Sequence, residues 1–320
     1  MKKVAILTSG GDAPGMNAAI RACVRYATSK GLEVYGVDRG YKGLIENNIF
    51  PLTSRSVSNT VHLGGTFLKS ARCLEFKDIK YRKIAAENLK KLGIDGLIVI
   101  GGDGSFTGAK ALSDDCGINV VGIPATIDND LQYTDYTLGF DTAVNTVLPL
   151  ISNLRDTMDS HDRAVIIEVM GRNCGDIALY SAICGGAEMC LVPEIPFDIN
   201  KVATTMLENR KKGKCSNILV VAEGVKGVKD LEKTLIGLTG MDIKTTTLGH
   251  IQRGGAPSMA DRMLATRFSI KAVDCIVAGK TNRVVGIKNN EIFDENITTA
   301  LSIPRQIDEK LYEIAKILSI

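Results

Sequence analysis

Short apolar runs alternate with amphipathic stretches along the whole chain. Apolar runs of strand length lie at residues 4–7, 33–37, 96–100, 120–123, 164–170, 189–192, 218–222 and 245–248. Stretches with helical spacing of apolar positions lie at 16–29, 81–92, 141–156, 201–211 and 260–278. This alternation is typical of a parallel sheet that helices cover on both faces. We therefore expect an α/β fold whose ligands bind beyond the carboxyl ends of the strands.

Several of the predicted strands run into similar glycine-rich loops. Gly10-Gly11-Asp12 follows the first apolar run, Gly101-Gly102-Asp103-Gly104 follows the third, and Gly171-Arg172 follows the run at 164–170. This similarity indicates a weak internal repeat. The length of 320 residues suits two domains. No low-complexity linker separates them, and the pattern itself breaks near residues 138–141.

Composition narrows the class of protein. Apolar residues make up 45% of the chain, charged residues 23%, and the net charge is +3, which are values for a globular protein without a basic nucleic-acid-binding stripe. No signal peptide or membrane-spanning stretch is recognised, so we expect no membrane partner. The eight cysteines contain no CxxC pair, which favours reduced thiols and a cytoplasmic location over disulfides or a metal centre.

The loop Gly101-Gly102-Asp103-Gly104-Ser105 is the first candidate for chemistry. Glycine lets backbone N–H groups approach phosphate oxygens, and the helix that follows favours negative charge. Asp103 in that turn is a candidate ligand for Mg²⁺. A plain strand-to-helix turn explains this loop equally well. It is neither a Walker A loop nor a dinucleotide fingerprint.

A second candidate loop, residues 124–130, follows the predicted strand at 120–123. Its two acids suit different tasks: Asp128 as the base that takes a proton from a sugar hydroxyl, and Asp130 as a group that helps to place a metal. The structural alternative is a turn rich in Asn and Asp.

Four arginines beside glycines or strand ends form the third candidate set, because guanidinium groups bind phosphate oxygens through two hydrogen bonds. They are Arg72, Arg163, Arg172 and Arg253. Each taken alone fits a solvated surface charge, and His250, taken alone, fits a core histidine.

Together these segments closely resemble the bacterial ATP-dependent 6-phosphofructokinases over nearly the whole chain. The matching segments are residues 7–17, 64–66, 70–72, 101–105, 126–130, 170–172 and 249–255, in the family's order and spacing. The resemblance implies two doubly wound domains with largely parallel sheets covered by helices, and an active site in the cleft between them. It implies an ATP-binding domain of residues 1–138 plus 251–301 and a sugar-phosphate-binding domain of residues 139–250 plus 302–320.

The resemblance also implies the reaction, which is ATP-dependent phosphorylation of fructose 6-phosphate to fructose 1,6-bisphosphate in glycolysis. Asp128 would be the base, Arg72 and Arg172 would offset charge on the transferred group, and Thr126 joins them as a catalytic residue. ATP would lie along Gly11, Arg72, Cys73, Gly102, Asp103, Gly104 and Ser105, with Mg²⁺ on Asp103. Fructose 6-phosphate would meet Thr126, Ile127, Asp128, Met170, Gly171, Arg172, Glu223, His250 and Arg253. Arg163 and Lys244 would reach the sugar's 6-phosphate from a neighbouring subunit.

Two small residues favour ATP over pyrophosphate as the donor. Pyrophosphate-using relatives carry aspartate at the position of Gly104 and lysine at that of Ala125, where both side chains would intrude on the nucleotide. Because this chain has small residues at both positions, the nucleotide fits.

The family is also a homotetramer with an effector site between subunits, where ADP activates and phosphoenolpyruvate inhibits. The matching positions are Arg21, Arg25, Arg55, Arg155, Gly186, Glu188 and Lys214. For each of the charged positions the alternative is a surface charge. Four departures affect affinity and regulation rather than the reaction: Lys244 in place of arginine, Cys73 in place of an aromatic residue, Asn59 in place of an acid, and Ala260 in place of tyrosine.

Three rival functions are less consistent with the motifs. An NAD or lipid kinase shares the Gly-Gly-Asp-Gly loop but is not expected to carry residues 126–130 together with 250–253. A silent nucleotide-sensing subunit has no need of both Asp103 and Asp128. A nicotinamide oxidoreductase lacks support because the glycine fingerprint is missing.

Overall fold

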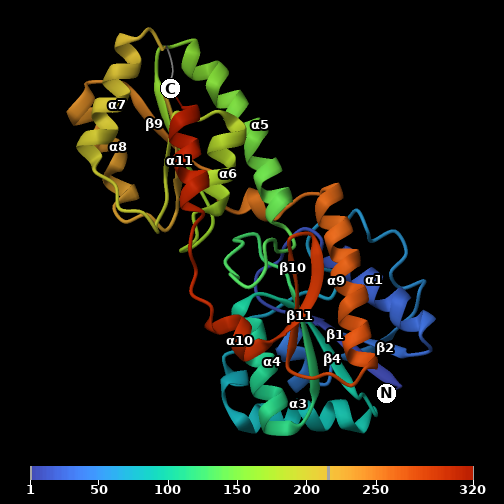
Figure 1. The fold of residues 1–320 in the computed structure, drawn as a ribbon. Coiled ribbons are helices and arrows are strands. Elements are labelled where there is room, and N and C mark those ends of the chain that lie inside the picture. The colour runs from blue at the N-terminus through green and yellow to red at the C-terminus, as the bar shows by residue number, and fades with distance from the viewer. Residues whose placement is uncertain (1, 215–216, 320) are drawn as a thin grey trace. The chain divides into compact units, whose positions relative to one another are not determined.

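The computed structural model describes residues 2–214 and 217–319, which divide into two compact units (Figure 1). Unit 1 comprises residues 1–127, 131–142 and 253–304, and unit 2 comprises residues 128–130, 143–252 and 305–320. The chain therefore passes between the units several times. The predicted assignment of ATP to one domain and sugar phosphate to the other stays a prediction.

Unit 1 is built on a seven-stranded sheet with the order β11-β10-β5-β4-β1-β2-β3. Its strands are β1 (Lys3–Thr8), β2 (Glu33–Val37), β3 (Ile49–Leu52), β4 (Gly96–Gly101), β5 (Asn119–Pro124), β10 (Arg283–Lys288) and β11 (Glu291–Asn296). The strands from β10 to β2 run parallel, and only the edge strands β3 and β11 pair antiparallel with their neighbours. The fully apolar β4 is buried along its whole length, as expected for a strand between two helical layers.

Helices cover this sheet and enclose its core. They are α1 (Met16–Ser29), α2 (Gly40–Ile45), α3 (Ile79–Lys91), α4 (Asp103–Cys116), α9 (Met259–Val277) and α10 (Ile297–Ser302), with the 3₁₀ turn η1 (Glu75–Lys77). Helices α1 and α9 pack against each other (Figure 1). Phe106 of α4 is fully buried against the sheet, with Leu97 and Val99 of β4 in the same apolar cluster.

Unit 2 has a smaller, entirely parallel sheet with the order β7-β8-β6-β9. Its strands are β6 (Ala164–Val169), β7 (Met189–Leu191), β8 (Asn217–Ala222) and β9 (Ile243–Thr247). Its helices are α5 (Phe140–Asp159), α6 (Asp176–Gly185), α7 (Ile199–Lys211), α8 (Val228–Thr239) and α11 (Glu309–Leu318), with the 3₁₀ turn η2 (Gly249–Arg253) where the chain returns to unit 1.

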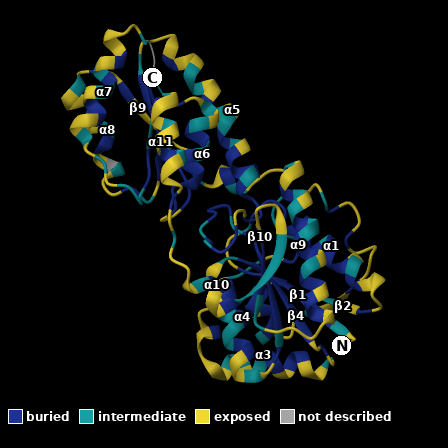
Figure 2. Cartoon of the chain, in the orientation of Figure 1, coloured by how far each residue is buried: buried dark blue, intermediate teal, exposed yellow. Residues whose placement is uncertain are grey.

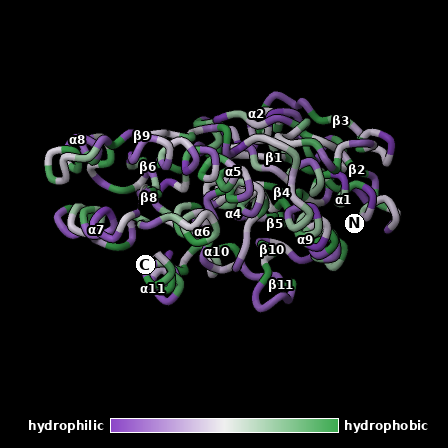
Figure 3. Tube along the Cα trace, turned by 90° about the horizontal axis from the view of Figure 1, so that it is seen from above, coloured by the Kyte–Doolittle hydropathy of each residue, from purple (hydrophilic) through white to green (hydrophobic). Residues whose placement is uncertain are grey.

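Burial follows the expected pattern in both units. Strands β1 and β4 are dark blue in Figure 2, whereas the outer faces of α7 and α8 are exposed. Hydrophilic residues gather on the outer turns of α7 and at the turn between β10 and β11 (Figure 3). Within the described residues, no helix combines the length and apolar character needed to cross a bilayer.

The predicted α/β class with largely parallel sheets is confirmed. Each predicted strand and helix corresponds to an observed one, and α1 has the predicted bounds. The strand predicted at 245–248 begins two residues earlier, at Ile243, and ends at Thr247. Strands β3, β10 and β11 were not predicted from the sequence.

Candidate functional site

In unit 1 the predicted phosphate loops lie side by side because their strands are neighbours. Strands β1 and β4 pair through Thr8 and Ile100, and the N–H of Ser9 donates to the carbonyl of Ile100 at 3.0 Å. On the other side of β4, the N–H of Ala125 donates to the carbonyl of Gly101 at 2.9 Å. The loops after β1, β4 and β5 therefore meet at the carboxyl edge of one parallel sheet.

Small residues keep these loops in close contact. A Cβ added to Gly101 would stand 2.5 Å from both the Ser9 carbonyl oxygen and Ser105 Oγ, so any larger residue would push the loops apart. The buried Ser105 also lies 3.4 Å from where a Cβ on Gly10 would be. A Cβ at Gly104, in contrast, would have no neighbour within 4 Å, so the space beside this residue is open.

The N-terminus of α4 is suited to an anion. The helix begins at Asp103, and its N-cap residue, Gly102, provides no side-chain hydrogen bond. Helices α7 and α9 are instead capped by the side chains of Asp198 and Ser258. The first N–H groups of α4 thus have no side-chain cap, and they carry the positive end of the helix dipole. The exposed carboxylate of Asp103 stands in that first turn.

Two of the predicted arginines belong to this region of unit 1. Arg253 Nη1 donates to the carbonyl of Asp12 at 3.1 Å, and a Cβ on Gly11 would stand 2.5 Å from that nitrogen. Arg72 is exposed, and Ser70 just before it donates its hydroxyl to the carbonyl of Gly10 at 2.7 Å. The Arg253 guanidinium is therefore tied to the Gly10–Asp12 loop, and the chain two residues before Arg72 is attached to the same loop.

The remaining predicted residues of unit 1 complete this edge. Thr126 follows β5, and its Cβ lies 3.8 Å from where a Cβ on Gly102 would be, while Ile127 is fully buried. The partly buried Cys73 packs beside the apolar cluster of Tyr41 and Phe76, and burial raises the pKa of its thiol.

In unit 2 the central feature is a buried carboxylate facing an exposed arginine. The side chain of Asp128 is 1% exposed and that of Arg172 is 63% exposed, and Arg172 Nε lies 3.2 Å from Asp128 Oδ2. The backbone N–H of Arg172 donates to Glu223 Oε1 at 2.9 Å. Arg172 thus joins the Asp128 segment to the residue that follows β8.

The tight loop after β6 gives Arg172 its orientation. Gly171 has φ +133°, and a Cβ there would stand 2.3 Å from the carbonyl oxygen of Cys174. Only glycine fits at this position. Arg172 follows with φ +53°, and a Cβ on Gly224 would stand 2.0 Å from its carbonyl oxygen.

Strand order collects the other residues predicted to bind the sugar phosphate at the same edge. The N–H of Glu223 donates to the carbonyl of Val169 at 2.8 Å, and the N–H of Leu248 donates to that of Glu168 at 3.0 Å. The ends of β8 and β9 thus flank the end of β6, so Glu223 and the exposed His250 lie on either side of Met170–Arg172.

Arg163 and Lys244 lie at the opposite end of that sheet. Arg163 immediately precedes β6, and Lys244 is in register with Val165 near the start of the strand. The six residues of β6 span roughly 20 Å. Both cations pair with Asp242, which lies 2.6 Å from Arg163 and 3.2 Å from Lys244. The pKa of this exposed carboxyl is lowered, mainly by the hydrogen bond from Lys244 and then by the charge of Arg163. Within one chain they do not approach Arg172.

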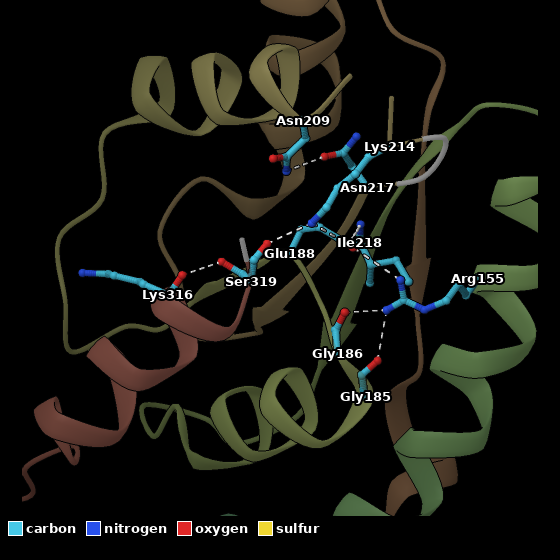
Figure 4. Close-up of polar contacts among 10 residues, drawn as sticks. All are labelled: Arg155, Gly185, Gly186, Glu188, Asn209, Lys214, Asn217, Ile218, Lys316 and Ser319. Carbon is cyan, nitrogen blue, oxygen red and sulfur yellow. Dashed lines mark hydrogen bonds and ion pairs between the residues drawn. The ribbon is translucent and has the colours of Figure 1, made fainter. Parts of the chain in front are cut away.

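The predicted effector residues of unit 2 form one polar cluster (Figure 4). Arg155 lies 3.3 Å from Glu188 Oε1 and donates to the carbonyls of Gly185 and Gly186 at 3.0 and 2.6 Å. Lys214 lies 4.0 Å from Glu188 and donates to the carbonyl of Ser319 at 2.9 Å. A cavity of about 750 Å³ between α6, α7 and α11 shares Gly186 and Glu188 with this cluster. Arg21, Arg25 and Arg55 belong to unit 1, where Arg21 and Arg25 lie one turn apart on α1.

Several supporting residues had no role predicted from the sequence. Gln252 is fully buried, accepts from the N–H of Met170 at 3.2 Å and donates to the carbonyl of Gly249 at 3.0 Å, so it holds β6 to the His250 segment. Its place inside the recognised segment at 249–255 was the available signal. No signal marked Arg305, which pairs with the buried Asp176. Among the described residues, no group of three or more His, Cys, Asp or Glu side chains is arranged to hold a metal by itself.

Comparisons with known proteins agree with this geometry. The family model "Phosphofructokinase" matches residues 3–276. The chain is 56% identical over 319 residues to ATP-dependent 6-phosphofructokinase 1 of Clostridium perfringens and 56% identical over 319 residues to ATP-dependent 6-phosphofructokinase of Clostridium tetani, with 100% of each chain covered.

Solved structures of phosphofructokinases also match the fold of this chain. The phosphofructokinase of Saccharomyces cerevisiae matches with a TM-score of 0.90 at 33% identity, over 100% of this chain and 48% of that one, so the chain spans about half the length of the yeast protein. A pyrophosphate-dependent phosphofructokinase from Nitrosospira multiformis matches with a TM-score of 0.87 at 21% identity, over 96% of this chain and 86% of that one, which is a likeness of fold alone.

Proposed function

Because the chain belongs to the phosphofructokinase family, we propose that it acts as an ATP-dependent 6-phosphofructokinase. It would phosphorylate fructose 6-phosphate at the 1-hydroxyl and release fructose 1,6-bisphosphate and ADP. The observation that carries this proposal is the buried Asp128 carboxylate beside the exposed Arg172, on a segment that directly follows the phosphate-loop edge of unit 1. The reaction is the committed step of glycolysis, and we assign it to the cytoplasm.

Asp128 has the chemistry of a general base for the sugar hydroxyl. As the hydroxyl proton moves to this carboxylate, a bond forms between the sugar's O1 and the γ-phosphorus. The bond from that phosphorus to the β,γ-bridging oxygen breaks, and ADP leaves. Positioning and electrostatics supply most of the catalysis in this kind of transfer. Arg172, with Arg72 from unit 1, would offset the negative charge on the transferred group.

The glycine loops and the N-terminus of α4 would hold the phosphates of ATP. Asp103 would hold Mg²⁺, and a single exposed carboxylate fits this ion because Mg²⁺ is usually bound by one or two carboxylates together with substrate phosphates. When bound, the ion would supply positive charge that offsets the negative charge of the ATP phosphates. The open space beside Gly104 supports ATP, rather than pyrophosphate, as the donor.

Arg163 and Lys244 support an assembly of several copies. They lie at the end of β6 opposite Arg172, so they would meet a sugar 6-phosphate only at the site of a neighbouring subunit. We therefore propose a homotetramer in which each copy lends these two cations to another.

Lys244→Arg is expected to lower the apparent KM for fructose 6-phosphate by a few-fold, because a guanidinium binds a phosphate through two hydrogen bonds and an ammonium acts as a point charge. Steady-state kinetics with varied fructose 6-phosphate would measure the change. Lys280→Arg, at another exposed lysine paired with an aspartate, serves as the control. An unchanged or higher KM would show that the second hydrogen bond of a guanidinium does not improve binding of the 6-phosphate at this position.

The cluster around Glu188 supports regulation by anionic effectors such as ADP and phosphoenolpyruvate. Lys214→Met is expected to weaken effector action about tenfold or more, because a hydrogen bond to a charged group is worth about 1.5–3 kcal/mol. The measurement is the effector concentration that half-maximally shifts the dependence on fructose 6-phosphate. Lys211→Met, at the exposed end of α7, should respond like the wild type. A wild-type response from Lys214→Met would remove this residue from the effector site.

One assay tests the main proposal. Turnover is expected with ATP, Mg²⁺ and fructose 6-phosphate, and none is expected when pyrophosphate replaces ATP. Formation of ADP coupled to an indicator reaction gives the rate. Absence of turnover with ATP, or equal turnover with both donors, would overturn the proposal as stated.

A further inference from the structure

A buried polar network lies directly behind the Asp128 segment of unit 2. Asn129 Nδ2 donates to Asp176 Oδ2 at 2.9 Å, and Arg305 Nη2 donates to Asp176 Oδ1. Arg305 also lies 4.0 Å from Glu194, whose Oε1 accepts from the N–H of Gly175 at 2.9 Å. The two oxygens of Asp176 therefore serve two different segments, one at residue 129 and one at residue 305.

Stability alone gives little reason for this network. Asp176 and Asn129 are each 7% exposed, and burial raises the pKa of Asp176 despite the opposing charge of Arg305. Buried ion pairs usually add little net stability, since apolar residues of similar volume do as well or better. Both carboxylate oxygens of Asp176 accept hydrogen bonds, however, and a polar group held on both sides defines one geometry. The arrangement is better explained by the position that it imposes on Asn129.

Anchoring Asn129 constrains both of the acids beside it. Asn129 has φ +51°, a left-handed backbone conformation that asparagine tolerates better than most residues. Its carbonyl also lies 3.9 Å from the Cys174 thiol. A single residue held by its side chain in this conformation sets the direction in which Asp128 and Asp130 leave the turn.

The same short loop holds the Asp128 segment at a second point. Arg172, at one end of the loop, pairs with Asp128, and Asp176, at the other end, pairs with Asn129. The N–H of Cys174 closes the loop by donating to the carbonyl of Gly171 at 2.9 Å. One attachment is exposed to the reaction and the other is buried, so the buried one can hold the segment while Arg172 contacts substrate.

We propose that Arg305 is a positioning residue that fixes the Asp128 carboxylate for proton transfer, acting through Asp176 and Asn129. This proposal rests on the proposed kinase function, in which Asp128 is the base. Arg305 is 129 residues away from Asp176 in the sequence and comes from the segment that precedes α11. A shift of about 1 Å at a reacting group can cost about 100-fold in rate, so a remote residue of this kind can affect kcat strongly.

Arg305→Met tests the proposal with the full-length protein. It is expected to lower kcat about 10- to 100-fold and to leave KM for ATP and fructose 6-phosphate within about threefold of the wild type. Arg305→Lys, which keeps the positive charge but not the planar guanidinium with its paired hydrogen bonds, should recover part of kcat. Hydrogen exchange should quicken in the peptide containing residues 126–132, and this readout does not depend on turnover.

Arg283→Met is the matched control, because Arg283 and Arg305 have side chains 26% and 22% exposed and pair with aspartates whose side chains are 5% and 9% exposed. The control should lower thermal stability without changing kcat or exchange at residues 126–132. Asn129→Gly keeps the left-handed backbone and removes the amide. If Arg305 acts through Asn129, the double variant with Asn129→Gly and Arg305→Met should lose no more kcat than the more impaired of the two single variants.

The outcomes distinguish failure of the positioning role of Arg305 from failure of the proposed kinase reaction. Wild-type kcat and unchanged exchange in both Arg305 variants would overturn the positioning role, and so would a loss of kcat that only matches a loss of folded protein. If the wild type itself shows no turnover while Arg305→Met still loosens residues 126–132, the proposed reaction fails and the network stands. If Arg305→Met does not fold, Arg305→Lys decides by the same two measurements.

Discussion

Replacing Asp128 by asparagine is expected to lower kcat by about 10²–10⁴-fold, the range that a positioned general base contributes. Asparagine has nearly the same shape, and its amide oxygen can stand near the Arg172 guanidinium at this fully buried position. It cannot take the hydroxyl proton. Fructose 6-phosphate should therefore still bind, and its affinity by calorimetry should stay within a few-fold of the wild type. Asp128→Ala should be nearly inactive as well.

Asp95→Asn provides the comparison for this variant. Asp95 is an exposed acid of unit 1 that immediately precedes β4 and accepts from the N–H of Lys2 at 2.8 Å, so it lies at the opposite edge of the sheet from the glycine loops. Its kcat should match that of the wild type. If Asp128→Asn kept wild-type turnover, another group would have to be the base.

Much of the fold was predictable because burial on both faces leaves a clear pattern. Strand β4, with the sequence Gly-Leu-Ile-Val-Ile-Gly, is a short apolar run that is rich in β-branched residues and flanked by glycines, which is typical of a buried strand. Helix α1 has its apolar and small residues on one face, and their spacing over residues 16–29 predicted its bounds. Parallel pairing then places the loops that follow neighbouring strands at one edge.

The edge strands could not be predicted in this way. Strand β11 contains Asp and Glu side chains and is only partly buried along most of its length, because one of its edges has no partner strand in the described sheet. Strand β3 includes Pro51, which is tolerated at the edge of a sheet. Neither strand has an apolar run or a clean alternation, so only pairing with β10 or β2 reveals them.

The candidate site was predictable only where its residues share a loop. Gly102 to Ser105 and Asp128 stand in short segments whose composition indicates chemistry. Asp176 stands behind the Gly171 loop, and Arg305 reaches it from 129 residues away without any local signal. Contacts of this kind depend on how β6, α6 and the segment before α11 come together in the folded unit, which no local pattern records.

Gly104→Asp is expected to lower kcat/KM for ATP about 100-fold. A Cβ at this position meets no atom within 4 Å, and Gly104 has no left-handed backbone, so the aspartate should fit without disturbing α4. Its carboxylate would stand beside the N–H groups proposed to hold the phosphates. A like charge in such a position costs several kcal/mol, and each 1.4 kcal/mol is a factor of ten. Steady-state kinetics with varied ATP at saturating fructose 6-phosphate would measure the loss.

Gly104→Ala separates charge from volume at the same position. It adds the methyl group without the carboxylate and favours the helix, so its kcat/KM for ATP should stay within about threefold of the wild type. Thermal unfolding should show both variants folded, since neither introduces a close contact. If Gly104→Asp used ATP as well as Gly104→Ala does, the phosphates of the nucleotide would have to lie elsewhere than at the start of α4.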